Sequence, residues 1–190
     1  MYGTQIDDLV DGKQGIDTFI ALGRRTEFLV KNSSSNYSIQ LKDGVEGVDQ
    51  LKNVERIKFY DQKVAIDLQS NQNAGMVVKA IGAVFGADAI KTHPEWVGLG
   101  LQILDGGMTY NGLMSLALNF VGLNTPDAIV SKLWANVIGT VPTVSDKKPF
   151  IDMLASGMAP GDLGVLAADT SFNLVKINLT GLQDTGVVFV

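Results

Sequence analysis

The second half of the chain contains a helical unit that is written twice, in residues 76–121 and again in residues 130–175. A repeat of this length predicts that the two copies fold alike and superimpose. A short length difference after Gly86 separates two blocks of matched positions. Lys79, Val84 and Gly86 match Lys132, Val137 and Gly139 at one spacing, and Gly107, Met108, Leu113, Leu116 and Ala117 match Gly157, Met158, Leu163, Leu166 and Ala167 at a slightly shorter one.

Composition limits what kind of protein this chain can be. A hydrophobic content of 46% and a charged content of 18% are typical of a folded chain. The net charge of −5 and the pI near 4.7 argue against nucleic-acid binding, because phosphate contacts need clustered Lys and Arg. The chain has no cysteine, which excludes disulfides and thiolate metal sites. Its longest apolar stretch, residues 96–104, is too short to span a membrane.

A glycine-rich nonapeptide stands near the start of the chain. Residues 12–20 fit the pattern G-G-x-G-x-D-x-U-x, in which U is a large apolar residue, except that Lys13 replaces the second glycine. One period earlier, residues 3–11 fit more loosely. Asp8 then falls where Asp17 falls, nine residues later.

This period has a physical reason in a parallel β-roll. Glycines allow tight turns, the aspartate supplies a carboxylate to calcium, and the apolar residues Val10 and Phe19 point into the core. The predicted calcium site consists of Gly12, Gly15, Asp17 and Asp8. Because Lys13 places a positive charge beside this site, a turn-rich strand without a bound ion remains the alternative.

Short strand-like runs with alternating apolar and polar residues follow the nonapeptides. They predict a small antiparallel sheet that extends the β-roll, in a first domain covering residues 1–73. We interpret Glu55 and Arg56, within this domain, as an exposed cross-strand pair. The predicted strands are 19–22, 27–31, 37–41, 56–60 and 64–68.

Four segments of this first domain carry a resemblance to a known family. They are residues 12–19, 22–30, 37–39 and 48–59, and the most specific part is Asn53-Val-Glu-Arg56 followed by Phe59, Asp61 and Val64-Ala65. Together they resemble a module of bacterial RTX proteins that follows hemolysin-type calcium-binding repeats. The resemblance implies calcium as a cofactor, export by the type I secretion machinery, and a secreted or cell-surface location.

Residues 74–190 predict an all-α domain made of the two similar helical units, so that the fold class is α+β. Thr125, Pro126 and Asp127 are a strong helix start, since threonine caps, proline suits the first turn and aspartate complements the dipole. In the helix that starts near Thr109, the spacing predicts an inward face. That face consists of Leu113, Leu116, Ala117 and Phe120.

No catalytic constellation is visible, and we expect no enzyme activity. His93 is the only histidine, and its place just before Pro94 is typical of a structural role at a helix start. This half of the chain resembles a helical domain of unknown function that follows the RTX module and is often duplicated. The resemblance rests on Val84-Phe85-Gly86, Trp96, residues 104–107, residues 133–139, Phe150 and residues 153–157.

The chain ends on an acidic residue and a short apolar run. The residues concerned are Asp184, Val187, Val188, Phe189 and Val190. They resemble the C-terminal secretion signal of type I substrates, and the alternative is an ordinary last strand packed on the core.

The sequence therefore predicts a non-catalytic C-terminal region of a secreted RTX protein that serves export and calcium-favoured folding. The alternative is an attachment module that binds a cell-surface component, either a glycan or a protein. An exposed groove lined by Trp96, Tyr110 or Trp134 would favour this alternative. Neither reading involves nucleic acid or a membrane span.

Overall fold

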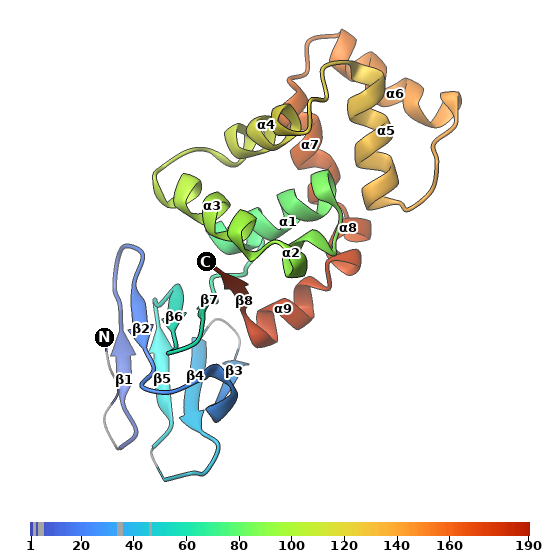
Figure 1. Ribbon diagram of the computed structural model, residues 1–190. Helices are drawn as coiled ribbons and strands as arrows, with labels where there is room; N and C mark the ends of the chain where they lie inside the picture. The colour runs from blue at the N-terminus through green and yellow to red at the C-terminus, as the bar shows by residue number, and fades with distance from the viewer. Residues whose placement is uncertain (2, 4–5, 34–35, 46) are drawn as a thin grey trace. The chain divides into compact units, whose positions relative to one another are not determined.

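The structure is a computed structural model that describes residues 1, 3, 6–33, 36–45 and 47–190. It confirms the α+β class, with strands in the first part of the chain and helices in the second (Figure 1). The chain forms two compact units, one of residues 1–75 with 180–190 and one of residues 76–179. Residues 180–190 therefore belong to the first of these units.

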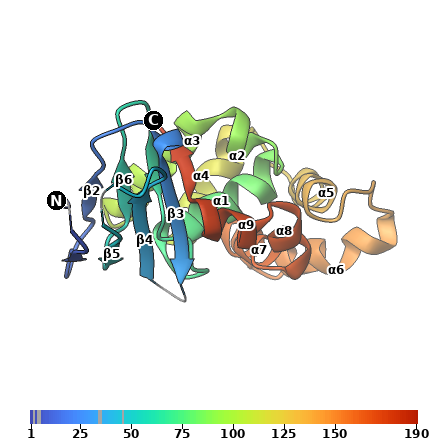
Figure 2. The same ribbon diagram turned by 90° about the horizontal axis from the view of Figure 1, so that it is seen from below.

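Two four-stranded sheets make up the β-structure that the described residues form. Their strands are β1 (Leu9–Asp11), β2 (Thr18–Ile20), β3 (Phe28–Ser33), β4 (Asn36–Leu41), β5 (Asp49–Lys52), β6 (Arg56–Lys58), β7 (Lys63–Ala65) and β8 (Val187–Phe189). The strand order is β1-β5-β4-β3 in one sheet and β2-β6-β7-β8 in the other. A 3-10 helix, Arg25–Glu27, leads into the antiparallel pair β3–β4, which Figure 2 shows side by side.

Both sheets are mixed, because each combines a parallel pair of the coil with antiparallel neighbours. Strand β1 runs parallel to β5 and β2 runs parallel to β6, and the remaining neighbours are antiparallel. The chain passes through the two sheets in turn. Strands β1 and β2 therefore form one level of a flattened coil, and β5 and β6 form the next level.

The apolar residue of each nonapeptide points inward, as predicted. Val10 lies opposite Leu51 in one sheet, and Phe19 lies opposite Ile57 in the other. Phe19, Leu51 and Ile57 are buried, and Val10 packs against the same core. The coil therefore encloses one continuous apolar core between its two sheets.

Residue 1 extends the coil beyond β2, on the side opposite to β6. The Met1 amino group donates to the carbonyl oxygen of Thr18 at 3.0 Å, and the N–H of Ile20 donates to the carbonyl oxygen of Met1 at 2.8 Å. This is the pattern of a parallel bridge opposite Phe19. Met1 precedes Phe19 by twice the nine-residue spacing of the nonapeptides, so two nonapeptides make one turn of the coil.

The apolar ending of the chain is a strand of the folded core. Strand β8 pairs with β7, and Val187 lies opposite Ala65 and is buried. The hydroxyl of Tyr37 donates to the carbonyl oxygen of Gln183, and Gln183 Nε2 donates to the carbonyl oxygen of Leu68 at 2.9 Å. These contacts explain why residues 180–190 belong to the first unit.

We expect Val187→Asp to destabilise the first unit by about 3 kcal/mol, because it buries a carboxylate against the core. Val188→Asp is the matched control, since the neighbouring side chain is on the opposite face of the strand and partly exposed. Urea unfolding followed by circular dichroism measures both. Equal losses in the two variants would contradict the burial argument.

The remaining elements are helices, and most follow the repeat. Helices α1, α3 and α4 occupy the positions that α5, α6 and α7 occupy in the second copy. Their bounds are α1 (Asn73–Phe85), α2 (Ala89–Thr92), α3 (Pro94–Asp105), α4 (Tyr110–Phe120), α5 (Pro126–Val137), α6 (Val144–Ala155), α7 (Pro160–Ala168), α8 (Ser171–Lys176) and α9 (Leu179–Thr185). Thr125 caps α5 as predicted, because its side chain accepts from the N–H of Ala128.

Equivalent helices of the two copies end in the same way. Gly107 after α3 has φ +92°, and Gly157 after α6 has φ +104°. The next residue in each copy donates its N–H back into the helix, Met108 to Ile103 at 3.2 Å and Met158 to Met153 at 3.1 Å. This backbone pattern is a glycine-based C-cap, and it explains why Gly-Met stands at the same place in both copies.

The two copies pack together through α4 and α7, which are equivalent helices. A Cβ added to Gly161 would lie 2.5 Å from the carbonyl oxygen of Asn111, and one added to Gly164 would lie 2.3 Å from Met114 Cγ. Asn111 and Gly161 occupy the same repeat position, as do Met114 and Gly164. Glycine on α7 therefore lets the two helices approach closely.

A second contact joins equivalent positions of α1 and α5. Asn136 Nδ2 donates to the carbonyl oxygens of Ala83 at 3.0 Å and Val84 at 2.7 Å. Asn136 and Ala83 again share one repeat position. Contacts between equivalent residues are the mark of a two-fold arrangement. The helical unit is therefore built like a dimer of two covalently joined copies.

Candidate functional site

Acidic residues of the two levels of the coil meet in pairs, through a main-chain N–H of one and the carboxylate of the other. The N–H of Asp8, just before β1, donates to Asp49 Oδ1 at 3.3 Å. The N–H of Asp17, just before β2, donates to Glu55 Oε2 at 2.8 Å. In both pairs the carboxylate belongs to the level formed by β5 and β6. It accepts the main-chain amide hydrogen of an acidic residue on the level formed by β1 and β2. The coil thus carries two stacked acid pairs, one beside each sheet.

Three of the four predicted calcium-site residues come together at one turn. A Cβ on Gly12 would lie 2.8 Å from Asp17 Cβ, and a Cβ on Gly15 would lie 3.9 Å from Asp17 Oδ2. The Asp17 side chain therefore lies over its own turn. A Cβ on Gly12 would also lie 2.0 Å from the carbonyl oxygen of Asn53, so only glycine fits there. Asp8 belongs to the other pair.

The second level repeats the turn pattern in altered form. Asn53, Glu55 and Ile57 take the places of Gly15, Asp17 and Phe19. Asn53 has φ +50° and Gly15 has φ +115°, so both adopt the left-handed conformation. Gly47, Asp49 and Leu51 repeat the pattern in the other sheet. These matches are a sequence signal for Asp49 and Glu55 that the reasoning from nonapeptides missed.

Asp11 ties the two levels together at the turn. Its Oδ1 accepts from Asn53 Nδ2 at 2.8 Å and from the N–H of Lys13 at 3.0 Å, and Lys52 Nζ lies 3.8 Å from its Oδ2. The hydrogen bond from Asn53 is the largest cause that lowers the pKa of Asp11, followed by the one from Lys13. Lys13 itself has φ +70°, the conformation that favours glycine.

The donor atoms of this turn are oxygens, the kind that calcium binds. Asp17 and Glu55 are hard oxygen donors, and calcium takes roughly six to eight oxygen ligands that include carbonyls and water. The positive charges of Lys13 and Lys52 oppose a cation there. Among the described residues, no group of three or more His, Cys, Asp or Glu side chains gathers as a metal site. Calcium would therefore depend on main-chain carbonyls and water as well.

The lowered pKa of Asp11 predicts a pH dependence. Its folded pKa lies below the ordinary value of 3.8, so the stability it adds is present above that value and is lost as the pH falls through the folded pKa. Asp11→Asn should therefore be less stable than the wild type near neutral pH, with the difference shrinking in acid. Urea unfolding at a series of pH values measures this. Asp43→Asn is the control, and an identical pH profile in both variants would contradict the assignment.

Arg56 is not the exposed partner of Glu55 that the sequence suggested. Its side chain is 5% exposed and forms an ion pair with Asp67, whose side chain is 3% exposed. Asp67 Oδ2 also accepts from the N–H of Ala74 at 3.2 Å. The pair links β6 to the segment leading into α1. Its burial and saturation by protein donors indicate a structural role.

Each helical repeat holds an apolar cleft at the same place. We call the first, between α1, α3 and α4, the wide cleft, and the second, between α5, α6 and α7, the narrow cleft. The wide cleft has a volume of about 320 Å³ and the narrow one about 110 Å³. Lining positions shared by the two repeats are Val77 and Val130, Ala80 and Leu133, Ile81 and Trp134, Phe85 and Ile138, Gly100 and Phe150, Leu113 and Leu163, Leu116 and Leu166, Ala117 and Ala167, and Phe120 and Thr170.

Aromatic rings gather at the wide cleft. The Trp96 ring lies 4.7 Å from Phe85 and 6.3 Å from Phe120, measured between centroids. His93 stacks on Trp96 at 3.8 Å with an interplanar angle of 8°. His93 Nδ1 lies 2.8 Å from Glu95 Oε1, and this hydrogen bond is the main cause that lowers the pKa of Glu95. His93 therefore fixes the tryptophan at the start of α3, which agrees with a structural role.

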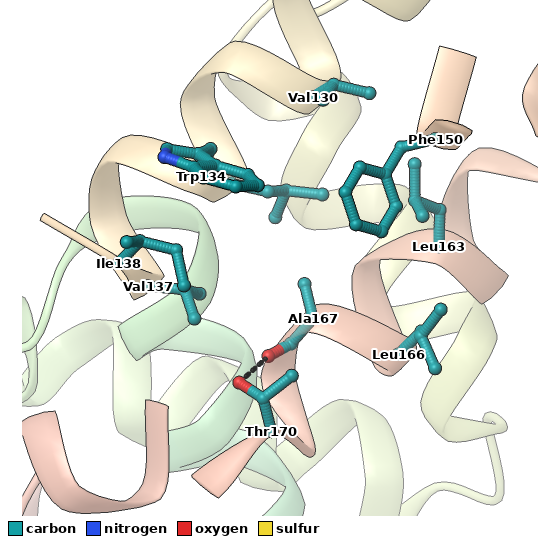
Figure 3. A pocket seen from close by; sticks show the side chains of 10 residues that line it. Val130, Trp134, Val137, Ile138, Phe150, Leu163, Leu166, Ala167 and Thr170 are labelled. Atoms are coloured by element: carbon teal, nitrogen blue, oxygen red, sulfur yellow. Dashed lines mark hydrogen bonds between the residues drawn. The ribbon is translucent and has the colours of Figure 1, made fainter. Parts of the chain in front are cut away.

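Two bulky rings fill much of the narrow cleft. Figure 3 shows Trp134 of α5 and Phe150 of α6 facing one another across it, and their centroids are 6.3 Å apart. The indole N–H of Trp134 points to the rim and donates to Thr140 Oγ1 at 3.0 Å. Thr170 lies at the far wall, where its hydroxyl donates to the carbonyl oxygen of Ala167 (Figure 3).

Tyr110 differs from the two tryptophans, because its ring is covered. The Lys79 ammonium lies 5.1 Å from the Tyr110 ring centroid and forms an ion pair with Asp169 at 2.5 Å. Burial is the main cause that raises the pKa of Tyr110, and Asp169 adds to it. Of the three aromatic residues named from the sequence, Trp96 and Trp134 therefore line clefts and Tyr110 does not.

One sequence expectation for α4 is corrected by the clefts. Leu113 is buried as expected, but Leu116 is 45% exposed and Phe120 is 75% exposed. Both belong to the rim of the wide cleft. The inward face of α4 toward the other repeat is formed instead by Met114 and Leu118, which pack beside Gly164.

Within the described part of the chain, no helix has the length and apolar character that a membrane crossing requires. Comparison with known proteins finds no family model that matches the chain, no curated protein of similar sequence and no solved structure of similar fold.

Proposed function

We propose that the chain is the non-catalytic C-terminal region of a secreted protein of the RTX type, in which it ends a calcium-binding β-roll and serves export by type I secretion. The observation that carries this proposal is the parallel stacking of Met1, Phe19 and Ile57 at one position of the coil. Stacking at a spacing of two nonapeptides is what consecutive repeats of this kind need. The antiparallel β3–β4 pair and β8 would then end the roll beyond β5 and β6, at the end opposite to Met1.

Calcium favours folding in this proposal. Asp17, Glu55 and the turn carbonyls near Gly12 and Gly15 would hold the ion, and Asp8 with Asp49 would offer a second, weaker place. Calcium would supply positive charge to the carboxylates that these residues contribute. A ligand that binds only the folded state stabilises it by mass action.

We expect calcium at millimolar concentration to raise the melting temperature by about 3 °C or more. Asp17→Asn should remove most of this shift. Lys13→Gly should enlarge it, because the variant removes a nearby positive charge and supplies the residue that φ +70° favours. Differential scanning calorimetry with calcium, magnesium or a chelator measures the shifts. An unchanged melting temperature in calcium would remove the ion from the proposal.

The type I secretion machinery would bind the export signal before the protein folds. Val187 is buried in the folded chain and β8 is hydrogen-bonded to β7, so the last strand is held in the sheet once folding is complete. Asp184, Val188, Phe189 and Val190 complete the proposed signal. The strand and signal readings of the tail then apply at different times, first in an unfolded and later in a folded chain.

A passenger protein fused to residues 1–190 should leave cells that contain a type I exporter and stay inside cells that lack one. Replacing Val187, Val188 and Phe189 together by Ser should abolish export, because the apolar ending is lost. Immunoblots of medium and cells measure the partition. Retention of the unaltered fusion in the exporter-positive cells would count against the proposal.

A second candidate function is attachment to a cell-surface component, and the two clefts favour it. Trp96 and Trp134 are half-buried and line apolar openings at the same place in both repeats. Apolar side chains that stay exposed beside a cleft are typical of interaction sites. In this reading, the exported chain would hold its passenger at a surface through the helical unit.

A further inference from the structure

The wide cleft combines a cavity with an exposed apolar rim. Leu99 is 56% exposed and Phe120 is 75% exposed, and Leu116 lies beside them. Each of these side chains could pack into a core, yet all three remain at the surface of the helical unit. An apolar patch that surrounds a cavity of about 320 Å³ marks a surface that another molecule covers.

The lining of the wide cleft argues against a sugar or another polar ligand. Its side chains are aliphatic or aromatic, and apart from the indole N–H of Trp96 they carry none of the polar groups that orient small polar ligands. Trp96 cannot serve as an open stacking platform, because His93 is stacked on its ring and Phe85 packs against it. The occupant must therefore present an apolar surface.

Comparison of the repeats shows that the wide cleft is not an unavoidable product of the fold. The narrow cleft has nearly the same helical framework, yet Trp134 stands there in place of Ile81, and Phe150 in place of Gly100. These larger residues reduce the volume to about 110 Å³. One repeat has filled its cleft with its own side chains, whereas the other has left room for those of a partner.

Charge indicates the kind of partner. The charged residues of helix α3 are both acidic, Glu95 and Asp105, and α4 has no Asp, Glu, Lys or Arg. Lys79 of α1 is buried and paired with Asp169, so it adds no positive charge at the rim. The cationic Lys91 lies on α2, which does not line the cleft. A second copy of this chain, with its net charge of −5, would be repelled, whereas a basic partner would be attracted.

We propose that the wide cleft binds the apolar face of a basic amphipathic helix from a partner protein. Such a helix presents apolar side chains at positions i, i+3, i+4 and i+7, which suit a groove between helices, and basic residues flank them. The inference rests on the attachment function and names the partner that this cleft takes.

A fluorescent peptide of about 18 residues, with leucine on one face of the helix and lysine on the other, is the probe. Fluorescence anisotropy with the full chain should give saturable binding that weakens as salt is added. Phe120→Thr, which copies Thr170 of the other repeat, and Leu116→Lys should each weaken binding roughly tenfold or more. Leu166→Lys, at the equivalent position of the narrow cleft, is the matched control and should bind like the wild type.

Trp96 provides a second readout, since Trp96 and Trp134 are the two tryptophans of the chain. In a Trp134→Phe background the peptide should change the tryptophan emission, and Phe120→Thr should suppress the change. Thermal melting of each variant confirms that it is folded. The proposal would be overturned if Leu166→Lys lost as much affinity as Leu116→Lys, or if a leucine–glutamate peptide bound as tightly as the leucine–lysine peptide. It would also be overturned if the chain bound phosphatidylcholine vesicles and not the peptide. Dimerisation through this cleft, detected by light scattering, would overturn it too.

Attachment of the purified chain to cell surfaces is measured separately. If the chain attaches to cells but the peptide does not bind, the cleft inference fails and the attachment function stands. If the peptide binds at the wide cleft but the chain attaches to no cells, the attachment function fails and the cleft keeps its ligand class.

Discussion

The parallel backbone pairing between the two levels of the coil is the interaction on which the first unit depends. Parallel strands cannot be joined by a tight hairpin, so the chain must cross to the other sheet and back before it returns beside itself. Each crossing turns a sharp corner, and Gly12 is there because any side chain would collide with the carbonyl oxygen of Asn53. The core follows from the same pairing, since it places Phe19 over Ile57 and Val10 over Leu51.

The corners show how stacked acids are held in this coil. In each pair a main-chain N–H of one level donates to a carboxylate of the next, at Asp49 and at Glu55. Asp11 adds a further link through Asn53 and Lys52. Carboxylates that accept protein donors need less help from a cation than bare ones.

Periodicity predicted the parts of the fold that local residues determine. The inward direction of Val10 and Phe19, the cap at Thr125 and the doubled helical unit all follow from short-range patterns. The second level of the coil escaped notice because Asp49 and Glu55 are only six residues apart, and Asn53 replaces a glycine. The repeat pattern is therefore present in the second level, but with a shorter spacing between its acidic residues and with a glycine replaced.

Other features depend on residues that are distant in sequence and could not be read locally. Arg56 was expected at the surface, yet it is buried, because Asp67, just after the neighbouring strand β7, forms an ion pair with it. Leu116 and Phe120 have the spacing of buried residues, yet they are exposed, because the face of α4 that contacts the other copy is formed by Met114 and Leu118. Helical spacing identifies an apolar face but not which of two neighbours covers it.

Duplication also explains how one unit can combine stability with an open cleft. Each copy buries part of its apolar surface against the other, through the glycines of α7 and through Asn136. That shared interface leaves the cleft of each copy free to change. In the second copy Trp134 and Phe150 close the space, and in the first Ile81 and Gly100 keep it open. The difference in volume arises within the clefts and leaves the helix ends at Gly107 and Gly157 alike, so the two copies share a framework and differ in the side chains that line their clefts.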